Sequence, residues 1–223
     1  MARKTKKESL ETRQDILTAA ARVFSTQGVA KTSLNDIAKE AGVTRGAIYW
    51  HFENKTDLFN ELWMALESDI NDVEHHFSTL YPDDPLKVVR VTTIYVLQVV
   101  VTDPKHRTLL EILFHKCEFV GELVPIIEAR QLQHLAGFDK IERNLYRCVL
   151  AGQLPRDLNT RIAAITLRSY VAGLIDNWLF MPEGFDLYSL AEDLVDGFLD
   201  MLINSPHLRI KIDKAREVND QLA

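Results

Sequence analysis

Apolar residues recur at helical spacing along nearly the whole chain, whereas the alternating pattern of half-buried strands does not dominate any segment. The clearest stripe lies near the C-terminus and consists of Leu187, Leu190, Ala191, Leu194, Val195, Phe198, Met201 and Leu202. A second stripe, formed by Ile16, Ala20, Val23 and Phe24, ends at Gly28. The pattern predicts an all-α protein.

Capping residues and prolines fall at the ends of these stripes. Ser33 with Asp36, and Asn54 with Asp57, have the spacing of a capping box, in which two side chains satisfy the free N–H groups of a helix start. A proline after a capping Asp is tolerated at the first helical position, where its missing N–H costs nothing. We expect helices to start after Thr12, Ser33, Thr44, Asn54, Asp84, Asp103 and Asn159, and a further helix to run from about Leu123 to Ala151.

The helix lengths predict two parts of unequal size and a tail. Residues 1–55 are expected to form a three-helix head, and residues 56–204 a larger helical bundle entered by a long helix. Residues 205–223 are polar and charged, so we expect this tail to fray.

Residues 32–52 have the pattern of two short helices joined by a tight turn, which is a helix-turn-helix. Gly42 and Val43 supply the bend and the apolar contact between the two helices. In such a motif the second helix enters the major groove, and its N-terminal residues face the base edges. The segment therefore predicts a DNA-binding protein.

Side chains that point outward from this motif are candidates for DNA contacts. Arg45, near the start of the second helix, has the guanidinium that binds guanine O6 and N7. Gly46 permits close approach of the backbone to the duplex, and Lys55 lies at a helix start that favours phosphate. For Trp50, burial in the core is an equal alternative. The full candidate set is Thr32, Ser33, Thr44, Arg45, Gly46, Tyr49, Trp50, His51 and Lys55.

The charge distribution supports this orientation. The 223 residues carry a net charge of −6, but residues 1–57 carry +3 and the remainder carries −9. A basic N-terminal end faces nucleic acid, whereas an acidic body does not.

Cys117 and Cys148 are the only cysteines, which is typical of a reducing compartment. We expect no apolar run long enough to span a membrane, because Gln98 and Asp103 interrupt the most apolar stretch, and therefore a cytoplasmic protein without membrane contact.

An enzyme is the main alternative from another functional class. Its candidates are His75 and His76, the segment 115–118, and scattered carboxylates. Adjacent histidines point about 100° apart on a helix, and none of these groups has a recognised catalytic or metal-binding spacing. We therefore expect no catalytic residues, no metal site and no cofactor.

Residues 32–55 resemble the N-terminal signature of the TetR family of transcriptional regulators. The segments 111–119 and 173–179 are similar to the AcrR and TtgR type in particular, which repress RND multidrug efflux pumps. This resemblance implies a TetR-like fold and a homodimer formed by the last two long helices. It also implies two heads on a palindromic double-stranded operator, and release of the operator by apolar or cationic drug-like inducers. The alternatives are a regulator that responds to a metabolite, and an activator.

The resemblance also implies an apolar ligand site inside the body, with a volume of roughly 300–1,000 Å³. Its expected lining consists of Leu66, Glu67, Ile70, Val96, Leu113, Phe114, Cys117, Ile141, Leu145, Val171, Ala172, Ile175 and Trp178. Ordinary core packing is an equal alternative for each apolar member. Glu67 is different because a carboxylate on an apolar helix face is costly to bury, and it is expected to pair with cationic ligands. The alternative for Glu67 is a residue exposed to water.

Overall fold

The computed structural model describes residues 6–117 and 124–211, without the side chains of residues 124–130, 132 and 133. Within these ranges the chain forms nine α-helices and no strand, which confirms the predicted all-α class. The helices are α1 (Lys6–Gln27), α2 (Leu34–Glu40), α3 (Arg45–His51), α4 (Lys55–Leu80), α5 (Pro85–Thr102), α6 (Pro104–His115), α7 (Val124–Leu150), α8 (Thr160–Phe180) and α9 (Leu187–Asn204), followed by the 3-10 helix η2 (Pro206–Leu208).

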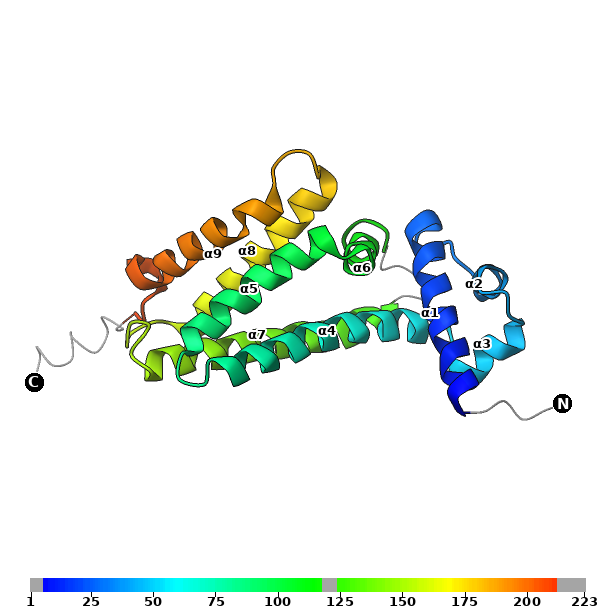
Figure 1. Ribbon diagram of the computed structural model, residues 1–223, viewed down its shortest axis with the longest axis horizontal. Helices are drawn as coiled ribbons and strands as arrows, with labels where there is room; N and C mark the ends of the chain where they lie inside the picture. Colours follow the sequence, from blue (N-terminus) through cyan, green and yellow to red (C-terminus); the bar gives the residue numbers. More distant parts are fainter. Residues whose placement is uncertain (1–5, 118–123, 212–223) are drawn as a thin grey trace, which may run out of the picture.

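Helices α1 to α3 form a head at one end of the molecule, and α4 runs from this head into the larger bundle (Figure 1). The predicted capping box of α2 is present, because Ser33 and Asp36 each satisfy a backbone N–H of the other. Thr44 and Asn54 cap α3 and α4, and each side chain accepts a hydrogen bond from the backbone N–H three residues later. Gly42 has a φ of +65°, so the turn between α2 and α3 uses a conformation that favours glycine.

The predicted start of the first helix is wrong. Helix α1 begins at Lys6, so Thr12 lies inside the helix instead of capping it. The Thr12 hydroxyl donates to the carbonyl of Glu8 within the helix, so this side chain does not cap a helix start. Residues 1–5 lie outside the described residues.

The helix starts of the body agree with the sequence. Asp84 and Asp103 each accept a backbone N–H ahead of a proline in the first turn, and Asn159 accepts the N–H of Ile162. Helices α5 and α6 end at Thr102 and His115. The predicted start of α7 near Leu123 lies outside the described residues.

Helix α5 lies inside the bundle and contacts α4, α6, α7, α8 and α9. Contrary to the expectation from Gln98, α5 is long and apolar enough, by length and composition alone, to cross a membrane. Leu97 and Val100 are fully buried against neighbouring helices, so the apolar character of α5 is that of a core helix.

The buried side chains form two apolar clusters. The head cluster contains Phe24 and Ile48 from the head, Leu58 from α4 and Ile112 from α6. The body cluster is built by α5, α7, α8 and α9, and Leu110 packs against both clusters. The head therefore packs against two body helices, α4 and α6.

The start of the tail is held in place, which corrects the prediction of fraying from residue 205 onward. Leu208 is buried and its carbonyl accepts the N–H of Asn159, while Ile210 donates to the carbonyl of Asp157. Arg209 pairs with Asp157 and also donates to backbone carbonyls at the end of α9. An apolar anchor at Leu208, which the charged composition obscures, explains this order. Residues 212–223 lie outside the described residues.

Candidate nucleic-acid interface and ligand-binding body

The second helix of the motif presents one face to the core and another to solvent. Ile48 is fully buried, and Phe52, which ends the helix, is 1% exposed. Trp50 is 81% exposed, which excludes the alternative that it belongs to the core. Arg45 and Tyr49 are also exposed, one turn apart. The exposed face of α3 thus carries a cation and two aromatic rings.

Arg45 and Tyr49 interact with each other on this face. One guanidinium nitrogen of Arg45, Nη2, donates to the Tyr49 hydroxyl at 2.9 Å, and the guanidinium carbon lies 5.4 Å from the centre of the tyrosine ring. This contact restricts the rotamers of a long side chain and leaves further N–H donors of the guanidinium available. Tyr49 therefore positions Arg45 on the exposed face of α3.

Thr32 has a structural position that the sequence did not predict. Its side chain is 3% exposed, and its hydroxyl donates to the carbonyl of Gly28 at 2.7 Å. This hydroxyl is therefore not on the surface where a phosphate would meet it. Ser33 is exposed, but its hydroxyl is bonded to Asp36 within the capping box. Hydrogen bonds from Ser33 hold the pKa of Asp36 below its usual value.

Lys55 connects the start of α4 to the loop between α1 and α2. Its Nζ donates to the carbonyls of Ala30 and Thr32 at 3.1 and 2.9 Å. The ammonium has three donors, so one remains for a further acceptor. Lys55 thus supports the fold of the head in addition to any contact with phosphate. His51 is half-buried, with its ring 6.3 Å from that of Phe52.

The predicted ligand-site residues divide between the two apolar clusters. Leu66, Leu113 and Cys117 belong to or pack against the head cluster. The body cluster includes or contacts Val96, Ile141, Leu145, Val171, Ile175 and Trp178. Phe114 is 38% exposed on α6, and Glu67, Ile70 and Ala172 are half-buried. The structure therefore spreads these positions over both clusters and places Phe114 at the surface, and their assignment to a ligand remains a prediction.

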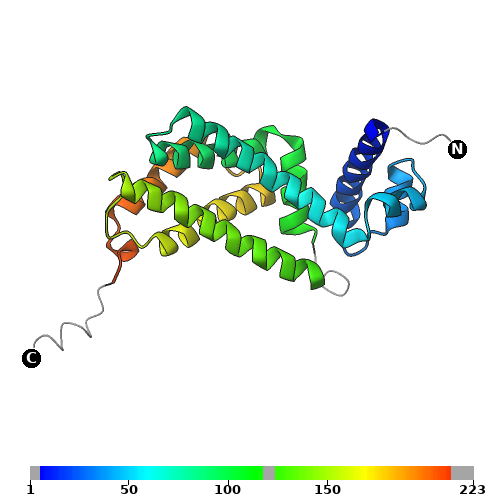
Figure 2. The same ribbon diagram turned by 90° about the horizontal axis from the view of Figure 1, so that it is seen from below.

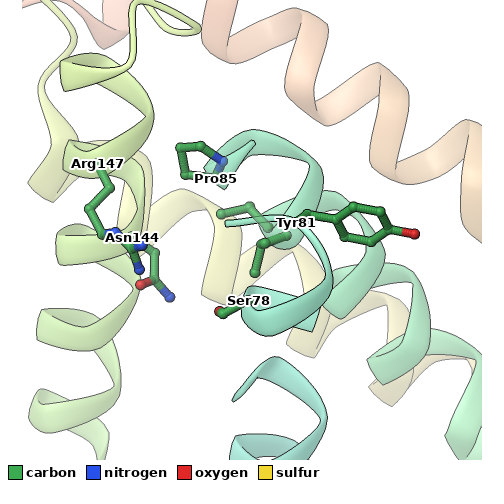
Figure 3. Close-up of a pocket in the computed structure, with 7 residues that line it drawn as sticks. Ser78, Tyr81, Pro85, Asn144 and Arg147 are labelled. Carbon is green, nitrogen blue, oxygen red and sulfur yellow. The ribbon is translucent and has the colours of Figure 1, made fainter. Parts of the chain in front are cut away.

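A shallow hollow of about 260 Å³, which includes open solvent, lies elsewhere in the body, at the turn between α4 and α5. Asn144 and Arg147 project from α7 toward the Tyr81–Pro85 turn (Figure 3). None of the predicted ligand-site residues lines this hollow, and its walls are partly polar. Its lining is unlike the apolar site that the sequence predicts.

Arg168 is an interior residue that the sequence reasoning missed. It lies half-buried on α8, and burial lowers the pKa of its guanidinium while the charge of Glu67 raises it. The sequence contained a signal for this position: Arg168 is three and seven residues before Val171 and Ile175, so it lies on the same helix face as these predicted ligand-site residues.

The described residues show no arrangement typical of a metal enzyme. In the ranges 6–117 and 124–211, no three His, Cys, Asp or Glu side chains are placed to hold a metal ion. Cys148 is buried in apolar surroundings, which raises the pKa of its thiol to about 12. Such a thiol is not a reactive nucleophile.

Comparison with protein families gives matches over both parts of the chain. Residues 16–62 match a family described as bacterial regulatory proteins, tetR family, and residues 84–204 match the C-terminal region of MAATS-type transcriptional repressors. The HTH-type transcriptional regulator AcrR of Shigella flexneri is 52% identical over 209 residues, which cover 94% of this chain and 97% of AcrR. TtgR of Pseudomonas putida is 43% identical over 209 residues, covering 94% of this chain and all of TtgR.

The structure also resembles that of SmeT in its complex with triclosan. The two superpose with a TM-score of 0.78 at 29% identity, covering 88% of this chain and 93% of SmeT. SmeT is described as the repressor of a multidrug efflux pump of Stenotrophomonas maltophilia. The family matches, the AcrR identity and this shared fold agree with the resemblance of the helix-turn-helix, and the chain is a member of the TetR family of bacterial transcriptional regulators.

Proposed function

We propose that the protein is a ligand-responsive transcriptional repressor that binds a palindromic operator as a homodimer and controls a multidrug efflux operon. The observation that carries this proposal is the exposed face of α3, with Arg45, Tyr49 and Trp50 above a buried Ile48 and Phe52. Apolar or cationic drug-like compounds act as inducers. A cytoplasmic location follows from this role, and no catalytic function is assigned.

Apolar side chains exposed on the last two long helices support the proposed dimer. They are Ile162 and Ile165 on α8, and Tyr188, Leu190, Met201 and Ile203 on α9, each at least 37% exposed. Exposed apolar side chains gathered on neighbouring helices are typical of contact sites between proteins, and α8 and α9 are in contact with each other. A two-fold dimer through these helices presents two heads, and half-sites one helical turn apart, roughly 34–36 Å, fit successive major grooves.

Coupling between ligand and head is proposed to run through α4 and also through α6. The N–H of Val29 in the head donates to the carbonyl of Lys116 at the end of α6, at 3.0 Å. His115 in the last turn of α6 contacts Asp176 of α8 at 3.0 Å. Helix α6 thus bonds the head on one side and the ligand-site helix α8 on the other. A ligand that binds one arrangement of these helices more tightly shifts the spacing of the heads.

Selection of bound sequences from random duplex DNA tests the proposed repressor. We expect the enriched sequences to be palindromic, and fluorescence anisotropy to show release of the selected duplex by triclosan and by rhodamine 6G. Enrichment of unrelated sequences would contradict operator recognition. Retention of DNA at saturating amounts of both compounds would instead favour the alternative of a metabolite-responsive regulator.

Gly46 offers a further test of the DNA-facing surface. A Cβ added there would meet only the Oγ1 of Thr44, at 3.9 Å, so the fold itself does not require glycine. We expect Gly46→Ala to raise the free energy of unfolding by up to about 1 kcal/mol while weakening operator binding, because the methyl group would separate the backbone from the duplex. Thermal denaturation and anisotropy measure the two effects. A stabilised variant with unchanged operator affinity would show that close approach is not needed.

A further inference from the structure

Arg168 lies on the face of α8 that carries proposed ligand-site residues. Arg168, Val171, Ala172 and Ile175 have the spacing i, i+3, i+4 and i+7, which places them on one side of a helix. Helix α8 packs against α7, and the two helices cross each other in Figure 2. A positive charge is therefore built into the wall that the family resemblance assigns to an apolar ligand.

The neighbouring helix is shaped to accept this guanidinium. A Cβ on Gly137 of α7 would overlap Nη1 of Arg168, so the absence of a side chain at residue 137 makes room for it. The ring of Phe138 lies with its centre 5.5 Å from the guanidinium carbon, a cation–π contact. Nη2 of Arg168 lies 3.1 Å from Nδ1 of His134. A single turn of α7, from His134 to Phe138, thus holds Arg168 in one place.

Arg168 is poorly satisfied for a half-buried cation. A guanidinium has five N–H donors, and among the described side chains Arg168 bonds only the ring nitrogen of His134. Glu67 on α4 is close enough for its charge to act on Arg168, but the described part of the chain shows no ion pair between them. Partly buried charges are costly unless they are paired, so this cation has donors available for an anionic partner.

Arg161 is the natural comparison because it lies on the same helix and faces the same ring. Its guanidinium carbon is 5.7 Å from the centre of Phe138. Unlike Arg168, it is paired with Asp139 at 2.6 Å and Glu142 at 3.1 Å. Its charge is therefore already neutralised by carboxylates of the protein.

We propose that Arg168 binds the carboxylate of an aromatic acid, whose ring lies among the apolar side chains on the same face of α8, Val171 and Ile175. This inference rests on the proposed function, since it assigns a ligand class to the same site. A carboxylate accepts two parallel N–H groups of a guanidinium, and such charge-assisted pairs are roughly twice as strong as neutral hydrogen bonds. Glu67 and Arg168 together give the site one charge of each sign, so it admits aromatic acids in addition to the cations expected at Glu67.

Three probes of equal shape and different charge test the proposal by calorimetry on the full-length dimer. They are 2-naphthoate, 2-naphthylmethanol and 2-naphthylmethylammonium. We expect 2-naphthoate to bind at least about tenfold more tightly than the neutral alcohol, because only the acid satisfies the guanidinium. Equal affinity for the acid and the alcohol would overturn the proposal.

Variants separate Arg168 from its surroundings. Arg168→Gln should abolish the preference for 2-naphthoate, and Gly137→Ala should reduce it by displacing the guanidinium, whereas Arg161→Gln should keep it. An equal loss in Arg161→Gln would overturn the assignment to Arg168. If Arg168→Gln does not fold, the proposal is still tested by the affinities of the wild-type protein for the three probes and by the Gly137→Ala variant.

The outcome is distinguishable from failure of the proposed function. If only the inference fails, the protein still binds its operator and releases it with triclosan, but it does not prefer the acid. If only the repressor proposal fails, calorimetry still detects 2-naphthoate binding, but no operator is bound or released.

Discussion

Arg45→Ala is expected to weaken operator binding by about 1–3 kcal/mol and to relax selectivity at one base pair of each half-site. Arg45 is exposed at the first position of α3, and Thr44 anchors the start of this helix by accepting the N–H of Ala47. A guanidinium at this position reaches the base edges of the major groove, where it binds guanine through two hydrogen bonds. Titration of the selected operator and of its single-base variants by fluorescence anisotropy measures both effects.

Tyr49→Phe is the matched variant because it keeps the ring beneath Arg45 and removes only the hydroxyl that accepts from Nη2. We expect a smaller loss of affinity with selectivity retained, since the guanidinium remains in place. A loss in Arg45→Ala that is equal for all duplexes would show that Arg45 contacts phosphates and does not read bases.

The helix boundaries were predictable where a local signal determines them. Ser33, Asn54 and Asp103 each bond a backbone N–H within three residues, so a short stretch of sequence contains the whole interaction. Thr12 has the same local pattern but lies inside α1, because the helix continues toward the N-terminus to Lys6. A capping residue therefore identifies a possible helix start, and the preceding residues decide whether the helix begins there.

The roles of Thr32 and Lys55 were not predictable because they depend on contacts between distant segments. Lys55 bonds carbonyls 25 and 23 residues earlier in the chain, which the sequence pattern around it does not encode. The effect of the Glu67 charge on Arg168 is a similar case, since it depends on how the bundle places α4 relative to α8. The sequence identified the carboxylate as unusual but gave no information about the cation near it.

Ile112→Ala is expected to lower the free energy of unfolding by about 2–5 kcal/mol and to weaken the release of operator by triclosan. Ile112 lies on α6, is 2% exposed and belongs to the head cluster together with Phe24 and Val29. Removing it leaves a cavity between the head and α6, so movement of α6 is transmitted less completely to the head. Urea denaturation measures the stability, and anisotropy in increasing triclosan measures the release.

Leu97→Ala provides the matched control for this coupling. Leu97 is fully buried on α5, but it belongs to the body cluster and not to the head cluster. Its truncation should lower stability by a similar amount while leaving the triclosan midpoint near the wild-type value, because the contact between α6 and the head is intact. If both variants shift the midpoint equally at a temperature where both are folded, the effect is one of general stability. Coupling then runs through α4 alone, since the apolar contact between α6 and the head would have no specific part in it.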